Sequence, residues 1–357
     1  MIYREAGQFK TSYTADQAVF PILQDRAFVL LLLVVAFVVV PLIADDYWLK
    51  AILIPFLVYS LAAVGLNILT GYAGQVSLGT GGFMAVGAYM SYKLMTAFPE
   101  LNVIITFLFS GFFAAAVGVV FGIPSLRIKG FYLAVATLAS QFFLIWLFNR
   151  VGWFYNYNPS GTIDAPPRFL MGIQVTGAAA SAEVKYLTAL SMLTLACLVT
   201  KNLVRGRVGR AWMAIRDMDI AAEIIGIRPL HTKLLAFAIS SFICGVAGAE
   251  MFALHLGSVE TIAFDVNLSF LILFMVIIGG LGSVMGSILG AGFMVLTPIL
   301  LTNVLVGWVG MQASSAKHVE FMVFGALIIF FLIVEPNGLA RLWQIAKEKL
   351  RLWPFPH

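Results

Sequence analysis

Long apolar runs recur along almost the whole chain, and they constrain the fold more than any other feature. The hydrocarbon core of a bilayer is about 30 Å thick and takes roughly 20 apolar residues per helix. The pattern predicts an all-α polytopic membrane protein with about ten transmembrane helices, of which the third, eighth and ninth are interrupted or shortened by glycine. The expected spans lie near residues 27–44, 48–69, 76–97, 101–122, 131–148, 185–203, 233–256, 266–279, 286–305 and 318–334.

Composition and charge indicate the same class. Hydrophobic residues make up 61% of the chain and charged residues 11%, whereas soluble domains contain about 45–50% and about 25%. Basic residues retained on the cytoplasmic side of spans explain the net charge of +5, so we expect contact with a lipid bilayer and not with nucleic acid. The two cysteines lie in apolar runs and the four histidines lack ligand spacing, so we expect no disulfide framework, metal site or cofactor bound by this chain.

The charges of the loops predict the orientation. If the amino terminus is cytoplasmic, the charged loop 204–232 and the basic tail 335–357 fall inside. We therefore expect both termini in the cytoplasm, with an amino-terminal segment 1–26 and a transmembrane domain 27–334 before the tail. The long outer loop 149–184 is rich in aromatic residues and turn formers, which fits either an interfacial cap or a docking or gating surface. The acids that fall outside are Asp45, Asp46, Glu100, Glu260 and Asp265.

The loop 204–232 is an island of charge with five arginines between two apolar runs. Helical spacing of its apolar residues predicts one short helix over 207–216. Asp219 is expected to cap a second helix, over 220–225, that stops at Gly226. A projection of this kind, on a chain without a soluble catalytic domain, is expected to present a surface to a partner.

Two segments, 67–82 and 279–290, are interrupted by glycine and lie among the apolar runs. Non-helical backbone at membrane depth is tolerated where protein or water covers it, so a broken span indicates a neighbouring cavity. The alternative is close helix packing, which the small residues at 118–122 also suggest. The first segment favours a cavity, and for the second both interpretations stay open. The candidate pathway residues are Asn67, Gly71, Gly74, Gln75, Ser77, Gly279, Gly280, Gly282 and Ser283, together with Thr137 and Gln141, which share one helix face.

Four sequence blocks, at residues 65–89, 124–139, 209–227 and 274–291, resemble the signature blocks of the LivM-type permeases. These permeases belong to the branched-chain amino-acid ABC transporter family. The blocks occur in family order, and the similarity extends from about residue 48 to about residue 340. Four long motifs in register are far more specific than one glycine pattern.

The resemblance implies a transport subunit, not an enzyme, in the inner membrane of a bacterium. It implies four kinds of partner: a LivH-type permease, two cytoplasmic ABC ATPases of LivG and LivF type, and a periplasmic solute-binding protein. The chain has no GxxxxGK[ST] motif, so ATP and magnesium are expected on the ATPases. Residues 210–226 match the segment that seats in a groove of the ATPase in this family. The coupling residues so implied are Arg210, Arg216, Asp217, Asp219, Ala221, Ala222, Glu223 and Gly226.

Two other functional classes fit the sequence less well. A stand-alone secondary transporter or channel normally has several ionisable groups at depth, and this chain offers Glu250 alone within its seventh expected span. An intramembrane enzyme would need paired acids, metal ligands or a nucleophile with its base. Relatives serve branched-chain amino acids, other amino acids, urea and organic acids, so the expected substrate is a branched-chain amino acid or a related small solute.

Overall fold

The computed structural model describes residue 12 and residues 23–126, 132–170, 172–308, 310–334 and 338–352. Within these residues the chain is almost entirely helical, as predicted. The α-helices are α2 (Leu23–Val34), α3 (Val40–Ile43), α4 (Ile54–Asn67), α5 (Thr80–Ala97), α6 (Val103–Leu126), α7 (Tyr132–Arg150), α8 (Ala182–Arg205), α9 (Arg207–Asp217), α10 (Asp219–Ile224), α11 (Pro229–Glu250), α12 (Val266–Gly279), α13 (Val284–Thr302), α14 (Ala313–Val334) and α15 (Gly338–Leu352).

Shorter elements extend or connect these helices. The π-helical segments are η1 (Val35–Val39), η2 (Trp48–Leu53), η3 (Ile68–Tyr72), η5 (Met251–Leu256) and η7 (Asn303–Trp308). Two 3₁₀ turns are η4 (Gly152–Tyr155) and η6 (Thr261–Phe264). The strands are β1 (Ile163–Asp164), β2 (Arg168–Leu170), β3 (Ile173–Thr176) and β4 (Ser258–Val259). Because η2, α4 and η3 are continuous, they form one long span with π-helical ends.

Eight helices of the described residues are long and apolar enough to cross a membrane, where the sequence predicted about ten. The expected spans 76–97 and 318–334 correspond to α5 and α14. α5 begins only at Thr80 and carries polar residues that lower its hydropathy, while the apolar stretch found in α14 is Met322–Phe331. The eight are Arg26–Ile43, Trp48–Tyr72, Val103–Ser125, Leu133–Arg150, Ala182–Arg205, Pro229–Leu256, Thr261–Gly279 and Val284–Gly307.

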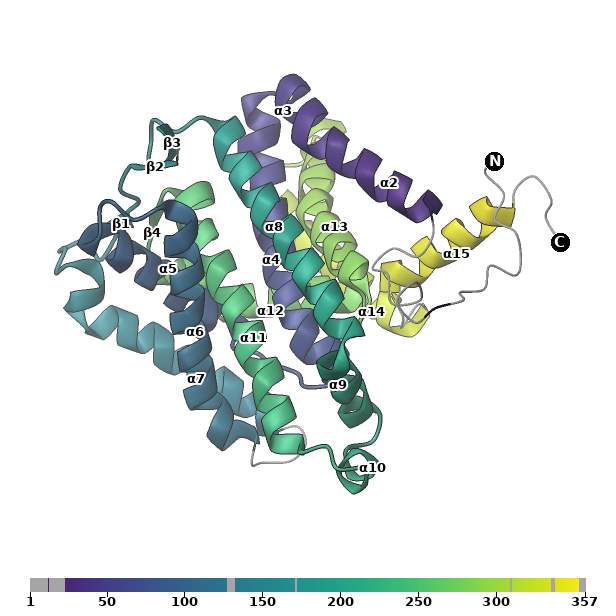
Figure 1. Ribbon diagram of the computed structural model, residues 1–357. Coiled ribbons are helices and arrows are strands. Elements are labelled where there is room, and N and C mark those ends of the chain that lie inside the picture. The colour runs from purple at the N-terminus through teal and green to yellow at the C-terminus, as the bar shows by residue number, and fades with distance from the viewer. Residues whose placement is uncertain are drawn as a thin grey trace.

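The loops gather at two opposite ends of the bundle (Figure 1). At the strand end, β1 pairs antiparallel with β4 and β2 pairs antiparallel with β3. At the α10 end lie α9, α10 and, close to Arg216, the turn between α12 and α13. The basic loop 204–232 is therefore separated from the acidic loop that follows α3, which is the separation that the loop charges predicted.

α11 is the central helix and packs against α4, α5 and α6. Small residues let the backbones approach. A Cβ added to Gly248 would lie 1.9 Å from the carbonyl oxygen of Met84 in α5, and one added to Gly118 in α6 would lie 2.4 Å from Ser241 Oγ. No larger residue fits these contacts without a shift, so the close packing predicted around 118–122 is confirmed.

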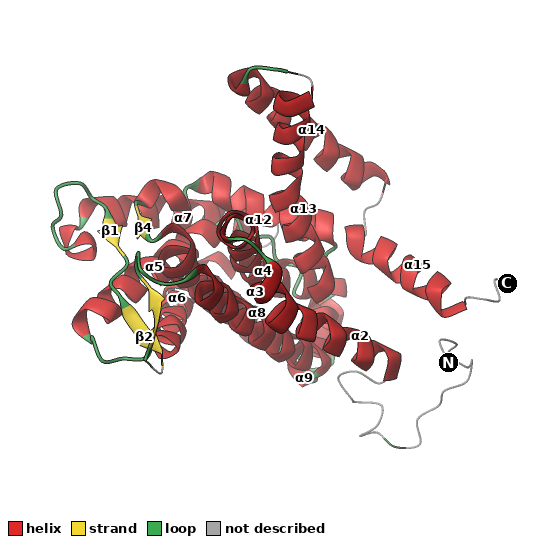
Figure 2. Ribbon diagram, turned by 90° about the horizontal axis from the view of Figure 1, so that it is seen from above, coloured by secondary structure: helices red, strands yellow, loops and turns green. Residues whose placement is uncertain are grey.

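The last helices lie to one side of the bundle. In Figure 2, α14 and α15 stand away from the strands. α15 begins at Gly338, whose φ is +68 and whose added Cβ would lie 2.6 Å from the backbone nitrogen of Gly280. Of the expected basic tail 335–357, the described residues 338–352 form a helix whose first residue, Gly338, lies against the α12–α13 turn.

Candidate functional site

The charged loop 204–232 folds as two short helices, as its sequence predicts. α9 buries one face: Trp212 is fully buried, and its Nε1 donates to the carbonyl oxygen of Thr232 at 3.0 Å. Gly226, with φ +92, follows the end of the second helix. The indole hydrogen bond fixes α9 against the start of α11, so the projection has a defined position.

The predicted cap of the second helix is wrong. Met218 is extended and occupies the N-cap of α10, while Asp219 is already its first helical residue. The helix starts one residue early, so the Asp219 carboxylate lies in the first turn, where the helix dipole favours negative charge. It also lies 3.8 Å from Lys233 Nζ at the start of α11. Lys233 is a residue that the sequence did not single out.

A group of apolar side chains on and beside α10 faces solvent. We call Met218, Ile220, Ile224 and Ile225 the α10 patch; each is between 63% and 81% exposed. Ala222 is buried beneath it, whereas Ala221 and Glu223 are exposed. An apolar cluster rimmed by charge on a helix that projects from the bundle is typical of a protein interaction site.

Arg216 connects α9 to the transmembrane bundle. Its Nη1 donates to the carbonyl oxygen of Gly71 in η3 at 3.0 Å, and its Nε donates to Asp217 Oδ1 at 3.0 Å. Its side chain also lies against Gly74, where an added Cβ would be 2.8 Å from Arg216 Cγ and where φ is +69. A displacement of α9 would therefore reach the broken segment 67–82 through direct contact.

Asn67, at the end of α4, joins that helix to the α12–α13 turn. Its Nδ2 donates to the carbonyl oxygen of Ser283 and to Ser287 Oγ, both at 2.8 Å. Its Oδ1 accepts from the backbone N–H of Gly282 at 2.9 Å. Gly71 must be glycine here, because an added Cβ would lie 1.9 Å from Asn67 Oδ1. We call these five residues the Asn67 junction.

Gln141 in α7 holds the first turns of two other helices. Gly82 of α5 donates its backbone N–H to Gln141 Oε1, and Gln141 Nε2 donates to the carbonyl oxygen of Phe264 at 2.6 Å, just before α12. Ser269 Oγ donates to the same Oε1 at 3.2 Å and accepts from Gly81 N–H at 2.8 Å. The first N–H groups of a helix have no partner within it. Buried side chains supply that partner for Gly81 and Gly82 of α5, so α5 begins inside the bundle, and Gln141 also holds the turn that precedes α12.

A polar cavity of about 360 Å³ separates the α9–α10 segment from the start of the loop 73–79. Gln75 lines it, is 4% exposed, and has no hydrogen-bond partner for either amide atom among the described residues. The other lining residues are Ala73, Gly74, Ile215, Arg216, Asp217, Met218, Asp219 and Lys233.

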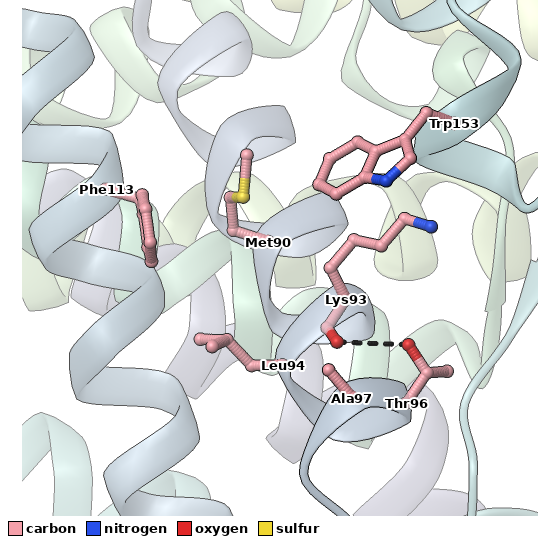
Figure 3. A pocket seen from close by; sticks show the side chains of 7 residues that line it. All are labelled: Met90, Lys93, Leu94, Thr96, Ala97, Phe113 and Trp153. Atoms are coloured by element: carbon pink, nitrogen blue, oxygen red, sulfur yellow. Dashed lines mark hydrogen bonds between the residues drawn. The ribbon is translucent and has the colours of Figure 1, made fainter.

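A second cavity, of about 430 Å³, lies at the strand end (Figure 3). Lys93 extends toward Trp153, with Nζ 4.4 Å from the ring centroid, and donates to Asn156 Oδ1. Arg168 donates to the carbonyl oxygens of Met95 and Pro99, and partial burial lowers the pKa of its guanidinium. These contacts attach the loop 149–184 to the end of α5. The remaining lining residues are Met90, Leu94, Thr96, Ala97 and Phe113.

Glu250 ends α11 and is fully buried, with neither carboxylate oxygen hydrogen-bonded among the described residues. Within those same residues, no group of three or more His, Cys, Asp or Glu side chains is placed to hold a metal ion.

The predicted site residues fall into connected groups. Asn67, Gly71, Gly282 and Ser283 meet in the Asn67 junction, and the neighbouring Gly279 packs against α13, where an added Cβ would lie 2.0 Å from the carbonyl oxygen of Gly286. Gly280 follows with φ +115.

Thr137 accepts from Leu78 N–H at 2.9 Å, beside the Gln141 bonds. Ser77 Oγ accepts from Gly79 N–H at 3.3 Å. Gly74 and Gln75 lie between these groups, against Arg216.

Three residues of these contacts were not predicted. Ser287 and Ser269 complete the Asn67 and Gln141 networks, and Lys233 faces Asp219. The two serines lie in apolar runs, where a lone serine gives no signal in the sequence. Arg210 is exposed on α9 and forms no hydrogen bond to the bundle among the described residues, so its predicted role remains a prediction.

The chain is similar to known proteins in sequence. Residues 49–332 match the family described as "Branched-chain amino acid transport system / permease component". The protein named high-affinity branched-chain amino acid transport system permease protein LivM, from Escherichia coli (strain K12), is 30% identical over 303 residues, which are 79% of this chain and 68% of that protein. The probable LivM of Methanocaldococcus jannaschii is 24% identical over 332 residues, 81% of this chain and 92% of that protein. A solved structure of PsaBC from Streptococcus pneumoniae in complex with Fab aligns with a TM-score of 0.42 at 13% identity, covering 86% of this chain and 98% of that one.

Proposed function

Because the chain belongs to the family of branched-chain amino acid transport permease components, we propose that it imports branched-chain amino acids as one half of a translocation pathway. The other half is a LivH-type permease. Two ABC ATPases of LivG and LivF type bind the α10 end, and a solute-binding protein delivers substrate at the strand end. The α10 end then faces the cytoplasm of a bacterium and the strand end faces the periplasm.

The contact of Arg216 with Gly71 and Gly74 is the observation that carries the mechanism. The α10 patch seats in the ATPase, and closure of the ATPase dimer on ATP displaces α9 and α10 as a unit. Arg216 passes this displacement to η3, and the Asn67 junction passes it to the α12–α13 turn. ATP and magnesium stay on the ATPases, and this chain supplies the mechanical contact that makes their binding favour one conformation of the bundle.

The test uses the α10 patch. Ile224 is 81% exposed, so Ile224→Asp should leave the fold intact and place a charge in the apolar contact. We expect substrate-stimulated ATP hydrolysis and uptake by the reconstituted complex to fall about tenfold, as when an interface anchor is lost. Ala221→Trp, at an exposed neighbour, should act in the same direction.

The matched control is Ile173→Asp, an exposed isoleucine at the strand end; co-purification of the ATPases with the permease should fall in Ile224→Asp and stay unchanged in Ile173→Asp. Uptake and ATP hydrolysis that are normal in both Ile224→Asp and Ala221→Trp would show that the patch does not contact the ATPase.

A further inference from the structure

The cavity beside Gln75 carries equal numbers of positive and negative side chains. Arg216 and Lys233 contribute two cations, and Asp217 and Asp219 contribute two carboxylates. An anion in the cavity would be repelled by the two carboxylates, and a cation would be repelled by the two positive side chains. A solute that carries both charges close together matches this lining better than either.

Hydrogen-bonding capacity remains in this lining. Lys233 Nζ and Asp219 Oδ2 are 3.8 Å apart, a distance too long for a hydrogen bond. The Lys233 ammonium group and the Asp219 carboxylate can therefore each bond to a ligand.

The same cavity has an apolar wall. Ala73, Ile215 and Met218 line it next to the charged groups. Its volume of about 360 Å³ lies within the range of about 300–1,000 Å³ that is usual for small-ligand sites. A charged head group and a short apolar side chain can both be accommodated.

We propose that this cavity binds an apolar α-amino acid in its zwitterionic form. Lys233 receives the α-carboxylate, Asp219 receives the α-ammonium group, and Ile215 with Met218 contacts the side chain. The inference rests on the proposed function and extends it, because it assigns the solute class a site at the α10 end, next to the Arg216 contact. Amino acid released from the pathway would occupy this site before it leaves the protein.

The experiment measures equilibrium binding of radiolabelled L-leucine to the purified full chain in lipid nanodiscs. Leucinamide lacks the carboxylate and 4-methylpentanoate lacks the ammonium group, and we expect each to compete at least about tenfold more weakly than leucine. Lys233→Gln and Asp219→Asn should each weaken leucine binding about tenfold, the change expected when a hydrogen bond to a charged group is lost. The matched controls are Lys50→Gln and Asp46→Asn, which alter a lysine–aspartate pair outside the cavity and should bind leucine as the wild type does.

A second measurement needs no variant. Acetylation of Lys233 by an amine-reactive reagent, followed by peptide mass spectrometry, should slow in the wild-type chain when leucine is present, while Lys50 should react at an unchanged rate. Absence of leucine binding to the wild type, wild-type affinity in both cavity variants, or unprotected Lys233 would each overturn the proposal. ATP-driven leucine uptake by the reconstituted complex separates the two ideas: uptake without binding in the cavity removes only this inference, and binding without uptake removes only the proposed function.

Discussion

At the scale of single residues, Asn67 concentrates most of the polar contact between α4 and the α12–α13 turn. Its amide uses two donor bonds and one acceptor bond on residues more than 200 positions away. Asn67 and Ser287 are both buried, and a buried polar group that loses its hydrogen bond costs more free energy than the bond gains when it is made. The side chain therefore holds the two glycine-interrupted segments in one relative position.

Asn67→Asp should destabilise the chain by about 1–3 kcal/mol, because the nearly isosteric carboxyl group loses the Nδ2 bonds and places an oxygen against the Ser283 carbonyl. The midpoint of thermal unfolding in detergent measures the effect. Asn202→Asp, at an exposed position in α8, is the control and should leave the midpoint unchanged. A wild-type midpoint for Asn67→Asp would contradict the assigned role.

At the scale of elements, the position of α5 depends on both of its neighbours. Its first turn is bound to Gln141 of α7, and its middle packs on α11 at Gly248. α5 is less apolar than the helices around it, and its partners rather than lipid surround most of it. Such a helix is held by packing and hydrogen bonds, so changes in its contacts should loosen it more than changes in its hydropathy.

Gly248→Ala should separate α11 from α5, because the added methyl group would lie 1.9 Å from the Met84 carbonyl oxygen. We expect a cost of about 1–3 kcal/mol, as for other overpacked cores, and faster maleimide labelling of the buried Cys244. Gly325→Ala in α14, where an added Cβ meets nothing within 4 Å, is the control. Identical Cys244 labelling in the two variants would be inconsistent with this packing.

At the scale of the whole molecule, the two ends differ in charge and in shape. Basic residues and the α10 patch occupy one end, and acidic loops with four short strands occupy the other (Figure 1). Basic loops stay preferentially in the cytoplasm. The proposed orientation therefore makes a direct prediction about accessibility.

Cysteine introduced at Ile224 should react with a membrane-impermeant maleimide only in inverted vesicles, and cysteine introduced at Ile173 only in right-side-out vesicles. Both positions are exposed, and the native Cys197 and Cys244 lie within spans. Peptide mass spectrometry distinguishes the sites. Labelling of position 224 in right-side-out vesicles would refute the orientation and, with it, binding of an ATPase at the α10 end.

The sequence alone determined the elements whose signal is local. Twenty-residue apolar runs predict helices because each helix satisfies its own backbone in lipid, and the amphipathic spacing of 207–216 predicted α9 in the same way. The sequence placed the start of the third span at residue 76, whereas α5 begins at Thr80. The loop 73–79 contains enough apolar residues to resemble the start of a span, but the chain turns at Gly74, where φ is +69. The family was also recognisable, because its motifs are long and contiguous.

Only the tertiary structure decided which of these residues act together. Arg216 and Gly71 are 145 positions apart, and Asn67 and Ser287 are 220 apart; no periodicity relates them. Lys233 of α11 lies 3.8 Å from Asp219 at the start of α10, and both line one cavity with Gln75 of the loop after η3. Local hydropathy determines that a segment is helical, whereas the hydrogen bonds and close approaches between distant segments depend on how all the helices pack at once.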